Sequence, residues 1–328
     1  MNKLIGPIAA LSLASFVLSG CAASGPDVVA HQGEAASSEG SQVDALQVVT
    51  TFSILEDIVN EVGAEYVDVH SIVPLGTDPH EYQPLPNDVK ATAEADLIVW
   101  NGLNMELGDG WLESLLETTG HALVDDHVVE ASLGVEPLYL SDLDGTDDEM
   151  NPHAFLDPNV GIIYTENIRD GLIQADPENA DAYTNNADAY INELSAIDRE
   201  YAAAIERIAP HHRTFVTSEN AFQYMNERYG LTGLYIWAID TGDLGSPSQI
   251  AHLVETLKQQ PVPALFIESN VDTRPMQTVS QETGIPIFGE VFSDELGAAD
   301  TEGASYLRML RSNLRQIEQG LGGEHSDD

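Results

Sequence analysis

The sequence predicts an α/β protein with two lobes, each built on a mostly parallel sheet flanked by helices, joined by one long rigid connecting helix. Three observations predict this class. Short β-branched runs alternate with amphipathic stretches along the chain, which is the pattern of α/β architecture. These runs fall into two sets, one in each half of the chain. A long helical stretch with little Gly and no internal Pro separates the two sets.

The first element is a predicted lipoprotein signal peptide over residues 1–20. Lys3 is followed by the apolar run 4–18, which is too short to cross a bilayer comfortably. The run ends in Leu-Ser-Gly-Cys, which resembles a bacterial lipobox, so we expect lipidation at Cys21. Cys21 is the only cysteine in the chain, so no intramolecular disulfide can form. The alternative is ordinary secretion with a stray cysteine.

The next segment, residues 21–45, is rich in Ala, Ser, Gly and acidic residues. It lacks enough apolar bulk to pack, so we interpret it as a flexible acidic tether. The rest of the chain is long enough for two domains of ordinary size. The predicted organisation is an N-terminal α/β lobe over 46–165, a connecting helical region over 166–209, a C-terminal α/β lobe over 210–320 and a disordered tail over 321–328.

The N-terminal lobe is expected to begin with a strand at Leu46–Phe52. Ser53 and Glu56 then fit a capping box that opens a helix ending near Gly63. Further strands are predicted at Tyr66–Val73, Asp96–Gly102 and Ala122–Asp125, with helical stretches between them.

The C-terminal lobe repeats this pattern after the connecting helix. That helix is predicted from about Pro177 to Ala209, and at the usual rise per residue it would reach about 50 Å, enough to run along both lobes and fix their spacing. The predicted strands and helices of this lobe follow in alternation, with strands at Thr214–Ser218, Leu234–Ile239, Ala264–Ser269 and Ile285–Phe292 and helices at Ser248–Gln260, Arg274–Thr283 and Gly303–Gly320.

The chain is extremely acidic, with 12 basic and 55 acidic residues and a formal net charge of −43. Such a field repels nucleic acid and anionic membrane surfaces, so neither is an expected partner. One interpretation of the charge is a trap for cations. The sequence favours the other, a solvated acidic surface as in proteins adapted to high salt, because net charge bears on solubility more than on specific sites.

Four side chains of the types that bind metals lie in turns or follow predicted strands. His80 lies in a turn-rich loop after a strand, where α/β proteins bind ligands. His153 lies in a proline-bounded turn, and Glu219 and Asp294 follow strands of the second half. Taken singly, each has a plainer interpretation, because a loop His is more often solvated and a carboxylate suits the start of a helix. The spacing of these four residues alone does not decide between metal binding and these plainer roles.

Five longer stretches give these residues a context: 70–86 (HSIVPLGTDPHEYQPLP), 95–102 (ADLIVWNG), 216–224 (VTSENAFQY), 266–276 (FIESNVDTRPM) and 303–306 (GASY). In this order they resemble the substrate-binding lipoproteins of manganese- and zinc-type ABC importers (cluster A-I), a group once described as adhesins. The resemblance runs from about Leu46 to Gly320. It implies a metal site between the lobes, with His80, His153, Glu219 and Asp294 as the ligands.

The resemblance also bears on which metal is carried. Members with a third His at the position of Glu219 resemble zinc importers, which usually carry a long loop rich in His and acidic residues. Here the segment Leu140–Met150 is acidic but holds no His. Two His and two carboxylates form a harder site that suits Mn²⁺ or Fe²⁺, although Zn²⁺ outranks Mn²⁺ at most N/O sites. We therefore expect Mn²⁺, with Zn²⁺ and Fe²⁺ as alternatives.

The chain departs from the family pattern at two positions. Members commonly have Asp-Pro-His where this chain has Asn151 before Pro152 and His153, and often an acid where it has Ala238. Neither change removes a ligand, but both bear on hydrogen bonds that orient ligands. His31, in the tether, has no assigned role. The remaining histidines match no ligand of the family and are expected to be structural or solvated: His70, His121, His127, His211, His212, His252 and His325.

The resemblance implies capture and delivery rather than catalysis. The loaded lipoprotein, a monomer anchored through Cys21 outside the cytoplasm, would dock on a membrane permease driven by an ATPase. A metallohydrolase needs an open coordination position and a nearby base, and the chain has no HExxH motif. A surface adhesin would leave the four ligands unexplained.

Overall fold

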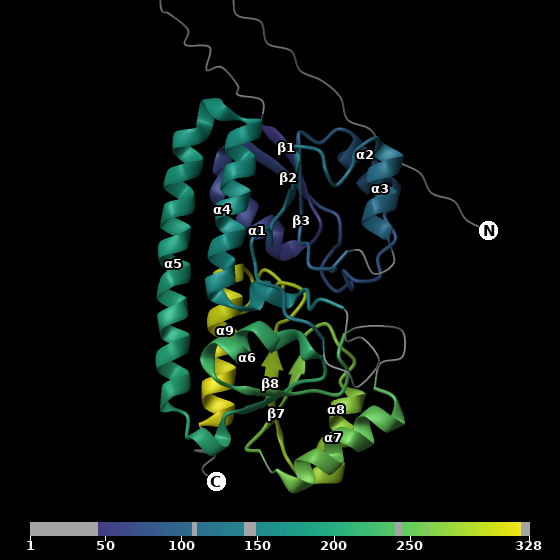
Figure 1. Ribbon diagram of the computed structural model, residues 1–328, viewed down its shortest axis with the longest axis vertical. Helices are drawn as coiled ribbons and strands as arrows, with labels where there is room; N and C mark the ends of the chain where they lie inside the picture. Colours follow the sequence, from purple (N-terminus) through teal and green to yellow (C-terminus); the bar gives the residue numbers. More distant parts are fainter. Residues whose placement is uncertain (1–44, 107–109, 141–148, 240–244, 261, 323–328) are drawn as a thin grey trace, which may run out of the picture. The chain divides into compact units, whose positions relative to one another are not determined.

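The computed structural model describes residues 45–106, 110–140, 149–239, 245–260 and 262–322 (Figure 1). All of them lie in the compact unit Val43–Asp328. The predicted signal peptide, Cys21, the tether up to residue 44, most of the acidic segment 140–150 and the tail from residue 323 lie outside the described residues. Among the described residues, no helix has the length and apolarity needed to cross a membrane.

The N-terminal lobe is built on a four-stranded parallel sheet in the order β2-β1-β3-β4. Its strands are β1 (Leu46–Thr50), β2 (Val67–Ser71), β3 (Leu97–Trp100) and β4 (Val128–Glu130). All four side chains of β3 are buried, as expected for a parallel sheet covered on both faces. In Figure 1, α1 and α4 lie on one side of this sheet and α2 and α3 on the other.

The helices of this lobe are α1 (Ser53–Gly63), the short 3₁₀ turn η1 (Ala64–Tyr66), α2 (Pro86–Ala93) and α3 (Trp111–Thr119). The helix expected to open at Ser53 is confirmed, but the capping box is wrong. Phe52 is the N-cap residue and makes no side-chain cap bond. Ser53 Oγ instead accepts a hydrogen bond from the backbone N–H of Leu296, 3.0 Å away, so this hydroxyl ties α1 to the far end of the chain.

The strand predicted at Ala122–Asp125 is also wrong, because this segment is a turn. The Asp125 backbone N–H donates to the Ala122 carbonyl at 3.0 Å, and the Asp125 carboxylate accepts from the Ala122 N–H at 2.7 Å. An Asp that binds its own local backbone in this way favours a turn over a strand. The fourth strand, β4, follows three residues later.

One long helix, α5, connects the lobes. The predicted connecting helix is confirmed as the 3₁₀ turn η3 (Pro177–Asn179) followed by α5 (Ala180–Arg207), whose 28 residues span about 42 Å. Figure 1 shows α5 running beside both lobes. The helix α4 (Pro158–Ala175) packs against α5. The predicted connecting helical region 166–209 includes its second half but not its start. The predicted boundary between residues 165 and 166 falls inside α4, and the domain limits remain a prediction.

The C-terminal lobe has two separate two-stranded parallel sheets, β5-β6 and β7-β8. Its strands are β5 (Thr214–Val216), β6 (Thr232–Leu234), β7 (Leu265–Glu268) and β8 (Ile287–Val291). Its helices are η4 (Pro210–His212), η5 (Asn220–Phe222), α6 (Gln223–Tyr229), α7 (Pro247–Gln259), α8 (Arg274–Thr283) and α9 (Tyr306–Leu321). The strand predicted at Leu234–Ile239 is wrong beyond its first residue, because only an isolated bridge between Glu219 and Trp237 continues the pairing.

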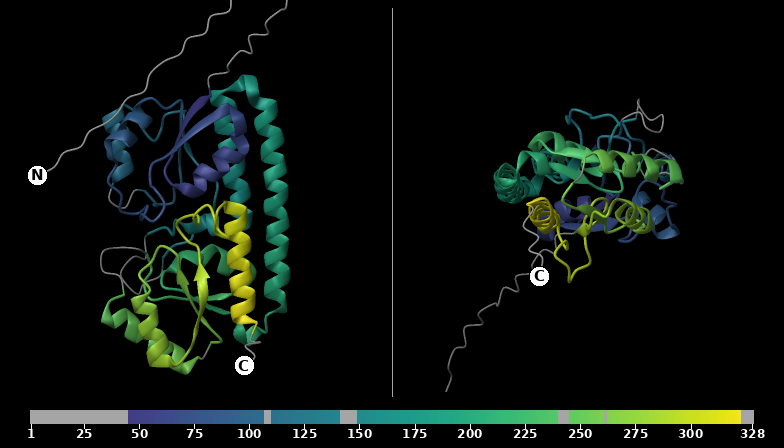
Figure 2. Two further views of the ribbon diagram at one scale, coloured as in Figure 1. Left: turned by 180° about the vertical axis from the view of Figure 1, so that it is seen from behind. Right: turned by 90° about the horizontal axis from the view of Figure 1, so that it is seen from below.

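The segment that leads into α9 crosses to the N-terminal lobe. The Tyr306 backbone N–H donates to Asp57 on α1 at 2.9 Å, and the Tyr306 hydroxyl donates to the carbonyl of Phe155. Figure 2 shows α9 beside α5 in the view from behind, and the two helices are in contact. The two lobes are therefore held together by these hydrogen bonds as well as by the connecting helix α5.

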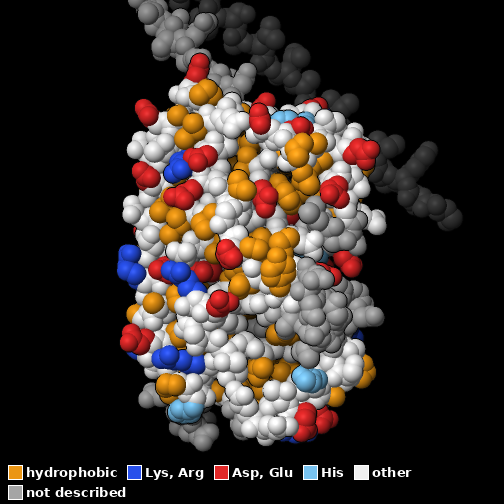
Figure 3. Space-filling model, in the orientation of Figure 1, with side chains coloured by type: hydrophobic (Ala, Val, Ile, Leu, Met, Phe, Trp, Pro, Cys, Tyr) orange, Lys and Arg blue, Asp and Glu red, His pale blue; other side chains and the backbone are white. Residues whose placement is uncertain are grey.

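The surface is acidic over both lobes, with few basic side chains on the face in Figure 3. Several arginines lie in ion pairs with neighbouring carboxylates, for example Arg207 with Glu318 and Arg315 with Glu302. Such exposed pairs contribute little to stability. Because the chain has 55 acidic but only 12 basic residues, most of the surface carboxylates have no basic side chain to balance them.

Candidate metal centre

The structure brings the four predicted donors together between the lobes. One ligand atom from each of His80, His153, Glu219 and Asp294 lies within 4.8 Å of the others. His153 Nε2 is 3.3 Å from His80 Nε2, 2.9 Å from Asp294 Oδ1 and 3.9 Å from Glu219 Oε2. All four side chains are buried, and the most exposed of them, His80, is 5% exposed. Donors from segments more than 200 residues apart thus converge on one enclosed point.

His80 is presented by the loop between β2 and α2. Its backbone N–H donates to Asp78 Oδ1 at 2.7 Å, and Trp111 Nε1 donates to the carbonyl of Pro79 at 3.1 Å. The His80 ring also hydrogen-bonds to the backbone of Met105. These bonds fix a loop whose prolines and glycine alone would leave it without regular structure.

Burial, together with the charge of nearby His153, lowers the pKa of His80 to about 4. A buried imidazole is harder to protonate because its charged form loses hydration. The ring is therefore neutral near pH 7. A neutral ring has a free nitrogen lone pair, which is what a metal ligand requires.

His153 lies in η2 (His153–Leu156), and Asn151 fixes which of its ring nitrogens carries hydrogen. Asn151 Oδ1 accepts both the His153 backbone N–H, at 3.0 Å, and Nδ1–H, at 2.8 Å. Asn151 Nδ2 donates to the carbonyl of Asn220 and to Gln223 Oε1, which settles the orientation of the amide. With hydrogen on Nδ1, the lone pair is on Nε2 and faces the other three donors.

Glu219 follows β5, and Glu268 on β7 holds its backbone in place. Glu268 Oε1 accepts the N–H groups of Ser218 and Glu219, at 2.8 and 2.9 Å. Burial raises the pKa of Glu268 to about 7. No role was predicted for Glu268. Its position at the end of the apolar strand Leu265–Glu268 could have indicated one, since buried acids are rare without a partner.

Asp294 follows β8 and is held by two neighbours. Asn270 Nδ2 and Ser293 Oγ both donate to Asp294 Oδ2, at 2.9 and 3.1 Å. Burial by itself would raise the pKa of this carboxyl, but His153 lowers it well below its usual range. Asp294 Oδ1 faces His153 and lies 2.9 Å from its Nε2.

The donor set fits a divalent cation. Two neutral imidazoles and two carboxylates bring two negative charges, which balance the charge of a divalent ion. Nε2 of His153 and Oδ1 of Asp294 both direct lone pairs into the same buried space, and lone pairs this close repel unless a positive charge lies between them. A metal ion, or in its absence a proton, satisfies that requirement.

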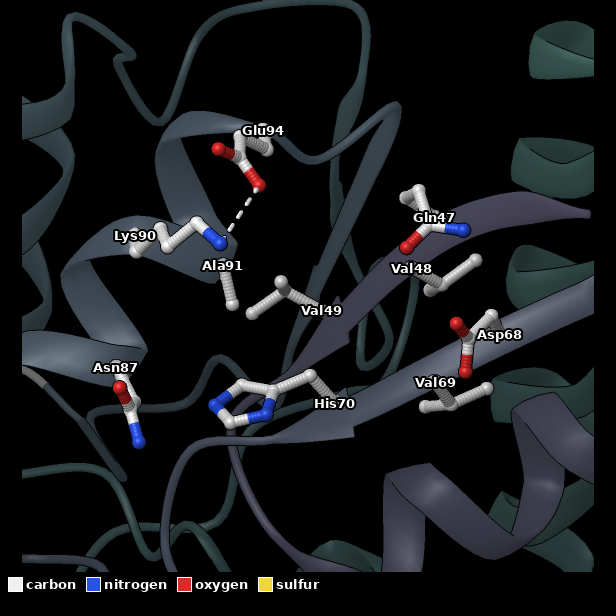
Figure 4. Close-up of a pocket in the computed structure, with 10 residues that line it drawn as sticks. All are labelled: Gln47, Val48, Val49, Asp68, Val69, His70, Asn87, Lys90, Ala91 and Glu94. Atoms are coloured by element: carbon white, nitrogen blue, oxygen red, sulfur yellow. Dashed lines mark ion pairs between the residues drawn. The ribbon is translucent and has the colours of Figure 1, made fainter.

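A separate hollow lies in the N-terminal lobe between β1, β2 and α2. It has a volume of about 380 Å³, and its polar lining includes His70, Asp68 and Lys90 (Figure 4). None of the four converging donors lines it. The candidate metal centre is the buried cluster, which is distinct from this open hollow.

The comparisons with known proteins agree with this geometry. Residues 48–320 match the family described as zinc-uptake complex component A, periplasmic. The chain is also 45% identical over 285 residues to the manganese ABC transporter substrate-binding lipoprotein PsaA of Streptococcus pneumoniae, covering 87% of this chain and 91% of that protein. The chain belongs to the family of metal-binding substrate-binding proteins of ABC importers. The resemblance predicted from its motifs is confirmed.

Two other relatives of this substrate-binding protein are named for different metals. It is 38% identical over 322 residues to the iron ABC transporter substrate-binding lipoprotein MtsA of Streptococcus pyogenes serotype M1, covering 98% of this chain and 99% of that one. The structure superposes with a TM-score of 0.76 on the periplasmic zinc-binding protein TroA of Treponema pallidum, at 26% identity, covering 84% of this chain and 99% of that one. The function is therefore capture of a divalent metal for an ABC importer, and the family consists of transport components rather than enzymes.

Proposed function

We propose that this substrate-binding protein carries one Mn²⁺ ion, held by His80, His153, Glu219 and Asp294, with Zn²⁺ and Fe²⁺ as the alternative cargoes. One observation carries most of this proposal: four buried donors, two nitrogen and two carboxylate, lie within 4.8 Å of one another. Carboxylate oxygens suit Mn²⁺ better than thiolates or additional imidazoles do. The similarity to a manganese lipoprotein supports the same ion.

The position of Glu219 is central to the choice of ion. An oxygen donor there keeps the site at two imidazoles and two carboxylates, whereas a histidine would make it softer and less negative. Affinity measured in isolation can still follow the general order in which Zn²⁺ binds N/O sites more tightly than Mn²⁺. Selection of Mn²⁺ then depends on which ion is available as well as on the site.

We further propose that Cys21 carries a lipid that anchors the protein, as a monomer, on the outer side of a membrane, where it docks on a permease coupled to an ATPase. The connecting helix α5 and the hydrogen bonds between Ser53 and Leu296 and between Asp57 and Tyr306 limit movement between the lobes. Metal release would therefore need contact with the permease to loosen the ligands.

Metal analysis of protein purified without chelator tests the cargo. We expect about one equivalent of metal per chain, with Mn²⁺ retained when the cells are grown with Mn²⁺ in excess of Zn²⁺. The His153→Ala variant, purified in parallel, should lose that equivalent, while His252→Ala, which changes an exposed residue of α7, should keep it. Wild-type protein that holds Zn²⁺ alone under manganese-rich conditions would contradict the choice of Mn²⁺. A His153→Ala variant that keeps its metal would contradict the site.

A further inference from the structure

A second cluster of imidazole and carboxylate donors lies in the turn between α3 and β4. One ligand atom from each of His121, Asp125 and His127 lies within 4.8 Å of the other two, and all three residues are half-buried. The turn enters β4 at the start of that strand, whereas the loop of His80 follows the end of β2, which belongs to the same parallel sheet. The cluster therefore lies at the opposite edge of the sheet from the metal centre.

His121 and His127 are joined by a hydrogen bond whose direction can be assigned. His121 Nε2 is 3.0 Å from the backbone carbonyl of Thr92, and a carbonyl only accepts hydrogen bonds, so this nitrogen carries the hydrogen. The lone pair of His121 is then on Nδ1. That nitrogen is 2.8 Å from His127 Nε2, which must donate to it. The lone pair of His121 Nδ1 thus points at the nitrogen through which His127 would bind a metal.

Asp125 completes the cluster and is held in place by the turn that it closes. Its Oδ2 accepts from the backbone N–H of Ala122 at 2.7 Å, and its own backbone N–H donates to the Ala122 carbonyl at 3.0 Å. The Asp125 carbonyl in turn accepts from the N–H of Val128, the first residue of β4, at 2.9 Å. The three donors are therefore presented by a turn whose backbone is already ordered by hydrogen bonds.

We propose that His121, Asp125 and His127 form a second metal site, on the surface of the N-terminal lobe, that takes Zn²⁺ in preference to Mn²⁺. Two imidazole nitrogens bound to one tetrahedral Zn²⁺ lie about 3.3 Å apart, so the observed 2.8 Å pair needs to open by only about half an ångström. Two imidazoles and a single carboxylate favour Zn²⁺ over Mn²⁺. Water would fill the remaining coordination position, because the cluster is open to solvent.

Binding requires only that a hydrogen move within one ring. Zn²⁺ needs the lone pair of His127 Nε2, so the hydrogen on that nitrogen must transfer to Nδ1 of the same ring. The hydrogen stays on the same ring, so this transfer releases no proton to solvent. The tautomer of His121, which is fixed by Thr92, does not change. Metal binding at this site should therefore be visible as a change of tautomer at His127 alone.

Zn²⁺ titration of the metal-free protein, followed by calorimetry, tests the site. Wild type should bind two equivalents, one tight and one weaker. His127→Ala and the milder Asp125→Asn should lose or weaken the second equivalent and keep the first. His153→Ala should do the reverse, so failure of this site and failure of the site between the lobes give different results. His252→Ala, an exposed histidine of α7, should behave as wild type.

Nitrogen-15 NMR of histidine-labelled protein gives a second readout that does not depend on counting equivalents. On addition of the second equivalent of Zn²⁺, the hydrogen of His127 should move from Nε2 to Nδ1 while that of His121 stays on Nε2. Only one equivalent of Zn²⁺ in wild type, or an unchanged second equivalent in His127→Ala with normal thermal unfolding, would overturn the assignment.

Discussion

Asn151 Oδ1 accepts a hydrogen bond from His153 Nδ1 at 2.8 Å, and the amide nitrogen of the same Asn151 side chain reaches the opposite lobe at the carbonyl of Asn220, 2.8 Å away. A single neutral side chain therefore both orients a proposed metal ligand and joins the two lobes. The family pattern described in the sequence analysis would place an aspartate at this position. The amide gives up a negative charge behind the histidine and gains a donor to the opposite lobe.

This relationship predicts that Asn151→Ala weakens metal binding. Loss of a partner that orients a ligating histidine typically reduces affinity about 10–100-fold, and we expect a reduction in that range. Asn151→Asp keeps an acceptor for Nδ1–H, so its affinity should stay within about tenfold of wild type. Calorimetric titration of Mn²⁺ decides the order, with Asn87→Ala, an exposed residue of α2, as the control. Equal affinities for Asn151→Ala and wild type would show that Asn151 does not orient His153.

Burial of Glu106 predicts a loss of stability as the pH rises. Burial raises the pKa of this carboxyl from 4.5 to about 7, even though Thr51, Asn101 and Gly102 donate hydrogen bonds to it. The folded protein thus binds a proton that the unfolded chain has released at intermediate pH. The contribution of Glu106 to stability is complete below about pH 4.5 and is lost between about pH 4.5 and 7, by about 3 kcal/mol for a shift of this size.

Urea unfolding of the metal-free protein between pH 4.5 and 8 checks this prediction. In Glu106→Gln, whose side chain cannot ionise, the free energy of unfolding should fall less steeply with pH than in wild type. Glu117→Gln, which changes an exposed carboxylate of α3, should follow the wild-type curve. Parallel curves for wild type and Glu106→Gln would mean that this carboxyl does not titrate in the expected range.

Much of the fold follows from local patterns, whereas the four candidate donors were chosen through the family resemblance. The helix Arg274–Thr283 agrees with α8 at both ends, because a Pro after its first residue and a Gly after its last mark its limits. The errors arise where tertiary contacts decide. Ser53 binds the backbone of Leu296 instead of capping its own helix. A partner 243 residues away cannot be predicted from the local sequence pattern.

The residues that hold the four candidate ligands in place were harder to predict than the candidate ligands. Glu268 and Asn270 lie within a stretch that resembles the family, but their roles depend on which backbone groups and side chains lie opposite them after folding. The start of α4 was missed, although Asp157 is its N-cap residue and Pro158 its first residue, a combination that often marks the start of a helix. The distances between donors from two lobes cannot be obtained from spacing along the chain.

The predicted lipid anchor leads to a simple localisation test. Cys21→Ser should abolish lipid attachment and release the protein from the membrane fraction, because the chain has no other cysteine to substitute for it. Phase separation in a mild detergent, followed by immunodetection, compares the variant with wild type. Ser19→Thr, which keeps the cysteine, serves as the control and should remain in the detergent phase. A Cys21→Ser protein that partitions fully with the membrane fraction would show that the cysteine is not the anchor.

The net charge of −43 predicts that salt stabilises the folded protein. Repulsion between surface carboxylates is screened over about 10 Å at 0.1 M salt and over about 3 Å at 1 M, so the unfolding temperature should rise across this range. Because the metal centre is buried, its affinity should change little. Thermal unfolding and Mn²⁺ titration at several NaCl concentrations measure both quantities. A steep loss of metal affinity with salt would instead support a surface that draws cations towards the site.

The choice of metal should depend most on Glu219. Its carboxylate is completely buried, and Oε2 lies 3.9 Å from His153 Nε2, so together with Asp294 it would neutralise a divalent ion. Glu219→His would give three imidazoles and one carboxylate, a softer set with a net positive charge when filled. We expect it to weaken Mn²⁺ binding by more than the roughly 10–100-fold that loss of an orienting hydrogen bond causes, while Zn²⁺ binding is kept. Glu219→Gln keeps the shape of the side chain but removes its charge, so it should weaken the binding of both ions.

Calorimetric titration of each ion into the metal-free proteins, with the exposed Glu227→Gln as the matched control, separates these outcomes. Unchanged Mn²⁺ affinity in both Glu219 variants would exclude this residue as a ligand and remove the main support for manganese.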